Sequence, residues 1–283
     1  MRRCVNPQST ARCSQCKRVM RKERLDKIVL DRGLAESRTR AQAMILAGVV
    51  LVGDQRADKP GQMVDSSAEI RIKGETPRYV SRGGLKLEAA LGEFGVSPDG
   101  MTCVDVGAST GGFTDCLLQH GASRVWAIDV GHNQLSWRIR QDPRVVVLEG
   151  QNARQLDPEQ FPVRFDLATV DVIFISLTKV LPAIVPCLKE SAECIALIKP
   201  QFEVGKGEVG RSGVVTDPKK HRRVLIEVLR SAAAMGLAAI NLIESPILGA
   251  EGNREFLAHL KLRACDQAKL AAIDDRIAAL TAE

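Results

Sequence analysis

The stretch that most constrains the fold of this chain is residues 102–115, where an apolar run gives way to a glycine-rich turn. One acid, Asp105, interrupts the run, and apolar side chains recur at helical spacing after the last glycine. This pattern predicts a buried strand, a tight turn and a helix. Gly107 would let the backbone turn sharply, while Gly111 and Gly112 would let a ligand approach the main chain without a Cβ in the way.

A second apolar run, Arg124–Ile128, ends in Asp129. An acid at the tip of the second strand of an open α/β sheet can accept hydrogen bonds from both ribose hydroxyls of a nucleoside ligand. The glycine turn reads Asp-x-Gly-x-x-x-Gly-Gly, which differs from the dinucleotide and P-loop patterns. Asp105 would offer negative charge where a sulfonium and an ammonium would sit. We therefore favour S-adenosylmethionine as the cofactor, and a simple strand-to-helix turn remains the alternative.

Length, composition and cysteine usage limit the class of protein. A chain of 283 residues suits one large and one small domain, and 45% hydrophobic residues can supply a core. The net charge of +6 permits nucleic acid as a partner without requiring it. No apolar run reaches the roughly 18–20 residues of a membrane span, and no secretory signal is visible. The eight cysteines are scattered, which is typical of a reduced, cytoplasmic protein. From the lack of an apolar run we expect no membrane association.

Changes in pattern along the chain predict five segments. They are a basic flexible tail (1–22), a small α+β RNA-binding domain (23–77), a linker (78–85), an α/β domain (86–265) and a C-terminal helix (266–283). The tail holds a Cys-x-x-Cys pair, Cys13 and Cys16. A tetrahedral zinc site needs four ligands and no second pair lies close, so we predict no metal site.

The small domain is predicted to place basic side chains on two helices against a small sheet. The helices are expected over 23–31 and 38–46, with Ser37 as the N-cap of the second, and short strands near 49–52 and 70–72. The residues predicted to bind RNA are Arg24, Lys27, Arg32, Ser37, Arg38 and Arg40, with Arg78, Tyr79 and Arg82 from the linker. Basic residues near a helix N-terminus suit a phosphate backbone, although a solvated charged face is the plain alternative. Tyr79 could stack on a base or hold the two domains together.

The stretch from Arg24 to Val64 resembles the small RNA-binding module first seen in ribosomal protein S-four. The match runs through Arg-Leu-Asp at its start, Ser37-Arg38, and Gly48-Val-Val-Leu-Val. The resemblance implies that this domain binds structured RNA.

The larger domain alternates strand and helix patterns from residue 102. Strands are expected near 102–106, 124–129, 145–148, 166–172 and 193–199, a helix over 219–236, and two last strands at 238–245 and 255–262. Near-continuous apolar strands with helical crossovers predict a parallel, doubly wound sheet. Ligands in such sheets lie at the carboxyl ends of the strands.

Two lysines and two carboxylates are expected near that edge. Asp171 and Lys199 come at the ends of the fourth and fifth strands, Glu255 opens the last strand, and Lys86 lies just upstream of the sheet. Converging on one pocket, the four could neutralise one another. The alternatives are a solvated helix lysine for Lys86, a helix cap for Asp171, a surface lysine for Lys199 and an edge-strand charge for Glu255. Asp166 competes with Asp171, but it begins its strand, away from the cofactor end.

The residue types favour one kind of methyl acceptor. A ribose 2′-hydroxyl is a poor nucleophile at pH 7, and a lysine that can take its proton, oriented by a carboxylate, meets that need. A base amine often uses an Asn/Asp-Pro-Pro-Tyr/Phe motif after the fourth strand. This chain has Asp171-Val-Ile-Phe-Ile-Ser there, so the amine interpretation fails. The glycine-rich stretch Gln201–Thr216 could close over substrate RNA, and His221 is expected at the surface or against RNA.

The Lys–Asp–Lys–Glu set resembles the tetrad of the FtsJ-type ribose 2′-O-methyltransferases, and residues 23–265 resemble the TlyA family. Members of that family carry the names hemolysin and ribosomal RNA cytidine-2′-O-methyltransferase. The matching stretches are Val80–Leu87, Asp105–Asp115, Asp171–Leu177, Ile198–Lys206 and Ser245–Glu255. The chain has Val172-Ile173 where members often have Leu-Ser after the catalytic acid.

The resemblance implies a Rossmann-like class I methyltransferase fold of the FtsJ type, with Lys86, Asp171, Lys199 and Glu255 as catalytic residues. It also implies that S-adenosylmethionine is held by Asp105, Gly107, Ala108, Ser109, Thr110, Gly111, Gly112, Phe113, Asp129 and Asn152. The expected activity is 2′-O-methylation of cytidine in ribosomal RNA within ribosomal subunits, with no obligate protein partner evident. The rivals are a non-catalytic RNA-binding or ribosome-assembly factor and a membrane-lytic protein.

Overall fold

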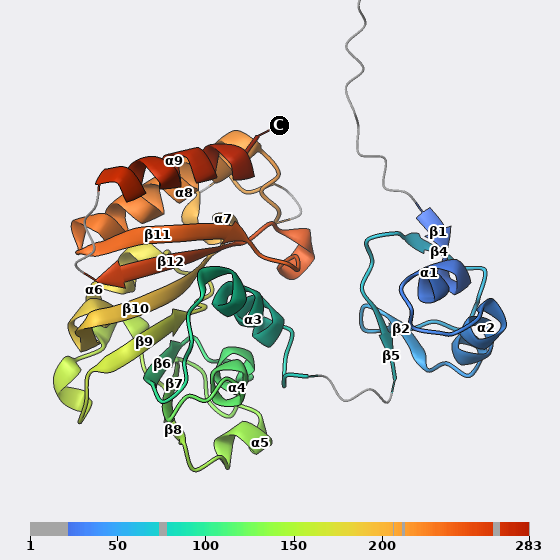
Figure 1. Ribbon diagram of the computed structural model, residues 1–283, viewed down its shortest axis with the longest axis horizontal. Coiled ribbons are helices and arrows are strands. Elements are labelled where there is room, and N and C mark those ends of the chain that lie inside the picture. The colour runs from blue at the N-terminus through green and yellow to red at the C-terminus, as the bar shows by residue number, and fades with distance from the viewer. Residues whose placement is uncertain (1–21, 74–77, 206, 211–212, 263–266, 283) are drawn as a thin grey trace, which may run out of the picture. The chain divides into compact units, whose positions relative to one another are not determined.

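The computed structural model describes residues 22–73, 78–205, 207–210, 213–262 and 267–282. The chain divides into two compact units, residues 1–76 and 77–283 (Figure 1). The predicted tail, with Cys13 and Cys16, lies outside the described residues except for Lys22. Among the residues described, no group of three or more His, Cys, Asp or Glu side chains could hold a metal ion. No helix in the described part is long and apolar enough to cross a membrane.

The N-terminal unit packs two helices against short strands. Its elements are β1 (Lys22–Arg24), α1 (Leu25–Asp31), α2 (Arg38–Leu46), β2 (Val50–Val52), β3 (Gln55–Arg56), β4 (Met63–Asp65) and β5 (Ile70–Ile72). Strands β3, β2 and β5 form one antiparallel sheet, and β1 pairs with β4. Leu25, Val29, Ala41, Ile45 and Val50 are fully buried between them.

The start of the first helix differs from the sequence prediction. Residues 22–24 form strand β1, paired antiparallel with β4, and the helix begins at Leu25 rather than residue 23. The pairing partner lies some forty residues away, so local periodicity cannot reveal it. The second helix begins as predicted, because the Ser37 hydroxyl accepts a hydrogen bond from the backbone N–H of Arg40.

The C-terminal unit is a seven-stranded sheet with helices on both faces (Figure 1). Its helices are α3 (Gly83–Phe94), α4 (Gly112–Gln119), α5 (Trp137–Arg140), α6 (Leu181–Ile184), α7 (Pro200–Glu203), α8 (Pro218–Ala234) and α9 (Gln267–Leu280). Its strands are β6 (Thr102–Val106), β7 (Arg124–Asp129), β8 (Val145–Glu149), β9 (Phe165–Val170), β10 (Leu188–Ile198), β11 (Leu237–Glu244) and β12 (Phe256–Leu262).

The strand order is β11-β12-β10-β9-β6-β7-β8. Five strands, β8 to β10 in this order, pair in parallel, and β12 pairs antiparallel with both β10 and β11. The order reverses between β6 and β9, and in open α/β sheets such a switch point creates a crevice at the carboxyl ends of the strands. The predicted doubly wound α/β fold is confirmed.

Alternate residues of each strand belong to two separate cores. Val125 and Ala127 face a core shared with α3, α4 and α5, whereas Trp126 and Ile128 face a core shared with α6, α8 and α9. Successive side chains of a strand point to opposite faces of the sheet. A sheet that is covered by helices on both faces therefore needs strands that are apolar on both faces.

The segment predicted as a linker, 78–85, is part of the C-terminal unit. Helix α3 already begins at Gly83, and Tyr79 is only 3% exposed within the core of α3 and α4. A Cβ at Gly84 would lie 2.3 Å from Tyr79 Cγ, so a glycine is needed for the ring to pack there. Because its ring is buried in the core of the C-terminal unit, Tyr79 is not exposed for stacking on an RNA base.

Candidate active site at the carboxyl edge of the sheet

The glycine turn brings two strand ends into contact. Gly107 has a φ of 87°, and a Cβ there would lie 2.4 Å from the carbonyl oxygen of Asp171. The backbone N–H of Asp171 donates to the carbonyl of Val106 at 2.9 Å. The turn after β6 thus holds the residue that follows β9.

The other two glycines serve packing within the protein rather than the approach of a ligand. A Cβ at Gly111 would lie 2.8 Å from Leu135 Cδ1, and one at Gly112 would lie 2.2 Å from Ser81 Oγ. The close approach at both positions is therefore made by the chain itself, which corrects the sequence interpretation. Gly112 still lines a cavity, described below.

Asp105 is not in contact with a ligand cavity, contrary to the prediction. Its side chain is fully buried, and its two carboxylate oxygens accept hydrogen bonds from Thr114 Oγ1 at 2.6 Å and Thr169 Oγ1 at 3.0 Å. The carboxylate therefore ties β6 to α4 and β9. Burial raises the pKa of Asp105 from 3.8 to about 7, although both hydroxyls act to lower it.

This burial predicts a distinctive pH dependence for Asp105→Asn. Between pH 3.8 and about 7 the folded state binds more protons at Asp105 than the unfolded state, so stability falls as pH rises through this window. An asparagine stays neutral and lacks that loss. We expect denaturant melts of the full chain to show the stability of the variant, relative to wild type, rising by up to about 4 kcal/mol from pH 4 to pH 7.

Asp142→Asn is the matched control for this experiment. Its hydrogen bond from Arg144 lowers the pKa of Asp142, so its contribution is lost only at acid pH and is constant above pH 5. Parallel stability curves for wild type and Asp105→Asn would contradict the prediction.

Asp129 ends β7 and faces the larger of two cavities at the strand ends, with a volume of about 950 Å³. Its Oδ2 accepts from the backbone N–H of Ser109 at 2.8 Å and its Oδ1 from that of Gly131 at 2.7 Å. Each carboxylate oxygen keeps a second lone pair, so two ribose hydroxyls could still donate to it. Asn152 lines the same cavity and caps a short turn by accepting from the Arg154 N–H.

The four residues of the predicted tetrad form two ion pairs. Lys86 Nζ donates to Glu255 Oε2 at 2.5 Å, and Lys199 Nζ pairs with Asp171 Oδ1. Lys199 also donates to the carbonyl of Val172 at 3.1 Å. Lys86, Glu255 and Lys199 are each less than a tenth exposed, so each buried charge has its counter-ion.

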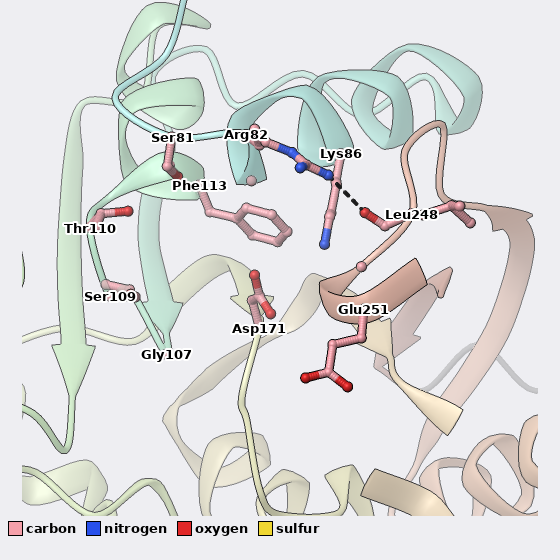
Figure 2. Close-up of a pocket in the computed structure, with 14 residues that line it drawn as sticks. Ser81, Arg82, Lys86, Gly107, Ser109, Thr110, Phe113, Asp171, Leu248 and Glu251 are labelled. Atoms are coloured by element: carbon pink, nitrogen blue, oxygen red, sulfur yellow. Dashed lines mark hydrogen bonds between the residues drawn. The ribbon is translucent and has the colours of Figure 1, made fainter. Parts of the chain in front are cut away.

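The smaller cavity, of about 320 Å³, lies between the glycine turn and the turn before β12. Lys86 from α3 and Asp171 both point into it, beside the ring of Phe113 (Figure 2). Asp171 also lines the larger cavity, together with Lys199. Glu255 lines neither cavity, and its carboxylate accepts the hydrogen bond from Lys86 Nζ. It is therefore a positioning residue rather than a group that would touch substrate.

The choice of Asp171 over Asp166 agrees with the structure. Asp166 accepts from the backbone N–H of Thr102 at 3.0 Å and from Lys189 Nζ at 2.7 Å, at the opposite end of the strand. It lines neither cavity.

Phe174, Phe202 and Glu251 are among the cavity residues that the sequence analysis did not single out. Phe174 is 84% exposed with a φ of 61°, and its ring meets that of Phe202 edge-on at 5.2 Å on the wall of the larger cavity. Glu251, with a φ of 57°, lines the smaller one. Nothing in the local pattern predicts a left-handed backbone at a phenylalanine, while Gly249 and Gly252 were a usable sign of a turn around Glu251.

The segment 201–216, predicted as a loop, begins with helix α7, and residues 206 and 211–212 lie outside the described part. His221 is fully buried, and its Nε2 bonds the carbonyl of Val215 at 2.9 Å. Its expected position at the surface was wrong, because it lies on the face of α8 that packs on the sheet.

Several of the predicted RNA-binding arginines are engaged within the N-terminal unit. Arg24 and Arg38 both pair with buried Asp26, at 3.0 and 3.1 Å. The hydrogen bond from Arg24 is the largest cause that holds the pKa of Asp26 well below its usual range. Arg32 donates to two backbone carbonyls, those of residues 66 and 68. These guanidinium groups remain at the surface but are oriented before any RNA arrives.

Lys27 pairs with Glu23 at 3.2 Å, and Arg40 is an exposed arginine of α2. In the C-terminal unit, Arg78 pairs with Glu88, while Arg82 donates to the carbonyl of Leu248 at 2.9 Å and lines the smaller cavity (Figure 2).

A doubly wound sheet with a glycine turn after β6, an acid at the tip of β7 and paired lysines at the strand ends defines a Rossmann-like methyltransferase. A family model described as FtsJ-like methyltransferase matches residues 79–262, and one described as S4 domain matches residues 23–70. The chain belongs to the FtsJ-like methyltransferase family, and the resemblance to TlyA proteins is confirmed.

Its relatives cover most of its length. The 16S/23S rRNA (cytidine-2′-O)-methyltransferase TlyA of Mycobacterium tuberculosis is 46% identical over 242 residues, 85% of this chain and 90% of that protein. Hemolysin A of Brachyspira hyodysenteriae is 43% identical over 237 residues, 83% and 98% of the two chains. The solved structure of a Streptococcus thermophilus protein named as a hemolysin is 43% identical, covers 93% of this chain and 96% of that one, and has a TM-score of 0.72.

Proposed function

We propose that this protein is an S-adenosylmethionine-dependent methyltransferase that modifies the 2′-hydroxyl of a cytidine in ribosomal RNA. The observation that carries the proposal is the ion pair between buried Lys199 and Asp171, which lies beside a cavity that Asp129 also lines. The named activity of the tuberculosis relative supports the choice of acceptor. Ribosomal subunits as substrate would place the activity in the cytoplasm.

The cavity residues fit the proposed cofactor. Asp129 keeps free lone pairs for two ribose hydroxyls, and Asn152 lines the same cavity. In the glycine turn, Gly107 and Ser109 border both cavities, while Ala108 and Thr110 border the smaller one. When bound, S-adenosylmethionine supplies a methyl group on a sulfonium, which is already a good leaving group. The protein must therefore mainly position and activate the acceptor oxygen.

Lys199 is placed for that task. Asp171 and the carbonyl of Val172 take two of the directions around Nζ, which leaves another for the acceptor oxygen. Lys199 must be the neutral amine, with its lone pair in that direction, to take the proton of the hydroxyl. Asp171 orients the amine and balances the positive charge that Nζ acquires when it takes the proton. Lys86, fixed by Glu255, borders the smaller cavity and can stabilise the oxygen as its proton leaves.

The direct test is methyl transfer from labelled S-adenosylmethionine to purified small and large ribosomal subunits. We expect label on ribose, detected as an alkali-resistant linkage at a cytidine. Label on a base, or cofactor binding with no transfer to either subunit, would overturn the proposal. The second result would favour a non-catalytic RNA-binding protein.

The N-terminal unit is proposed to hold the RNA through its basic face, and Arg40→Ala tests this. Arg40 is exposed, and one lost phosphate contact should weaken binding several-fold for any sequence and lower the salt slope by about 1. Filter binding of ribosomal RNA across a salt series measures both. Arg230→Ala, which removes an exposed arginine from α8, is the control, and an equal loss in the two variants would count against a dedicated RNA face.

A further inference from the structure

Glu251 lies in an unusual backbone conformation at the mouth of the active site. Its φ of 57° and ψ of 13° are in the left-handed region, which favours glycine and asparagine. The flanking Gly249 and Gly252 show that the turn could have used a glycine here. A glutamate in a backbone conformation that favours glycine indicates a functional role for its carboxylate.

The turn that carries Glu251 is rigidly braced. Gly249 N–H donates to the carbonyl of Asn253 at 2.9 Å, and Gly252 N–H to that of Gly249 at 3.2 Å. Asn253 is 2% exposed and donates to the carbonyl of Gly213 at 3.0 Å. Its Oδ1 accepts from the Val215 N–H, also at 3.0 Å. The backbone at Glu251 is thereby held at one place on the cavity wall.

The carboxylate of Glu251 has no partner among the side chains and backbone groups that the structure describes. Within the described residues it forms no hydrogen bond or ion pair, whereas Lys86 and Lys199 are paired with Glu255 and Asp171. Glu251 is exposed and is one of the residues that line the cavity that Lys86 and Asp171 enter. Its carboxylate extends to the side of the turn away from Lys86 (Figure 2). An incoming ligand is therefore the available partner for its oxygens.

The hydrogen-bonding groups of RNA limit which part of it could bind the carboxylate of Glu251. An ionised carboxylate only accepts hydrogen bonds and is repelled by phosphates, so on an RNA-facing rim it must meet a donor. RNA offers donors in its 2′-hydroxyls, in the imino groups of guanine and uracil, and in the exocyclic amino groups of bases. Of these, the N4 amine distinguishes cytosine from uracil, and a glutamate suits it. Uracil presents a carbonyl oxygen at the same place, which would leave two acceptors facing each other.

We propose that Glu251 accepts a hydrogen bond from the amino group of the acceptor base and so selects cytidine over uridine. The inference rests on the proposed function, since it needs an RNA ribose as acceptor. Glu251 would read the Watson–Crick edge of a base that is turned out of its helix, as enzymes acting on single nucleotides require.

The test compares cytidine and uridine at the methylated position. After the position is mapped with wild-type protein, ribosomal subunits are prepared from plasmid-encoded RNA with either base there, and kcat/KM is measured for each. We expect wild type to prefer cytidine by about 10- to 100-fold. Glu251→Gln, whose amide can donate or accept, should reduce the preference at least fivefold, mainly by improving uridine. Glu227→Gln on the outer face of α8 should leave it unchanged.

Cofactor titrations by calorimetry distinguish the other outcomes. An unchanged base preference in Glu251→Gln overturns the inference, as does a tenfold loss of S-adenosylmethionine affinity with the preference intact, because the carboxylate would then face the ammonium of the cofactor. Wild-type protein that methylates no ribosomal RNA would overturn the proposed function itself, and that failure is visible before any variant is made.

Discussion

Replacing Lys199 with methionine is expected to lower kcat for ribose methylation about 1000-fold, while the affinity for S-adenosylmethionine changes little. Proton removal by a positioned side chain contributes about 10²–10⁴ in rate, so a loss near 10³ corresponds to about 4 kcal/mol in the activation barrier. Lys199 is only 7% exposed, and its Nζ contacts Asp171 and the Val172 carbonyl. Because water has little access to this position, solvent does not readily take over the removal of the proton. Single-turnover methyl transfer with saturating cofactor measures the effect.

Lys199→Arg separates two roles of this lysine. A guanidinium keeps the positive charge but cannot be deprotonated in proteins. If Lys199 takes the proton, the arginine variant stays as inactive as the methionine variant; recovery of activity would mean that charge alone is needed.

Lys179→Met is the matched control, since Lys179 is an exposed lysine on the wall of the same cavity. It should change the KM for RNA more than kcat. Normal circular dichroism and cofactor binding of Lys199→Met would show that its loss of activity is not a loss of fold. Full activity in a folded Lys199→Met would remove the lysine from the mechanism.

Gly107→Ala is expected to have the largest effect on stability and to impair cofactor binding at the same time. The left-handed backbone at this position costs a non-glycine residue roughly 1–2 kcal/mol. The new Cβ would also lie 2.4 Å from the carbonyl oxygen of Asp171, and relieving such an overlap costs about a further 1–3 kcal/mol. The relief must move either the turn or Asp171, so both cofactor affinity and kcat should fall at least tenfold.

Gly95→Ala separates the two contributions. Gly95 also has a positive φ, 65°, but nothing lies within 4 Å of a Cβ there. It should therefore show the backbone cost alone and keep its activity. Urea unfolding and calorimetric titration with S-adenosylmethionine compare the two variants, and equal destabilisation of both would contradict the contact inferred between the glycine turn and Asp171.

The residues that end predicted strands were correctly located by the sequence. Asp129, Asp171 and Lys199 follow or close apolar runs, and in a parallel sheet the carboxyl ends of all strands share one edge. Their proximity therefore follows from strand periodicity and topology alone. The same reasoning found Ser37 as a helix cap, because the signal for a cap is local.

The contacts of individual side chains could not be predicted from these local sequence patterns. Lys86 and Glu255 are 169 residues apart in the chain, and only the folded sheet shows that they pair. Asp105 looked like a ligand contact from its place before Gly107, but the threonines that bury it come from α4 and β9. Gly111 and Gly112 looked like room for a ligand, yet their neighbours are Leu135 and Ser81.

The sequence by itself determined the two-part organisation, the doubly wound sheet and the edge at which chemistry can occur, because hydrophobic periodicity and turn residues act over short stretches. The tertiary structure alone decided which lysine pairs with which carboxylate, that Tyr79 and His221 are buried, and that Phe174 and Glu251 border the cavities. Those outcomes depend on contacts between distant segments, which form only when the strands assemble and bring their ends together.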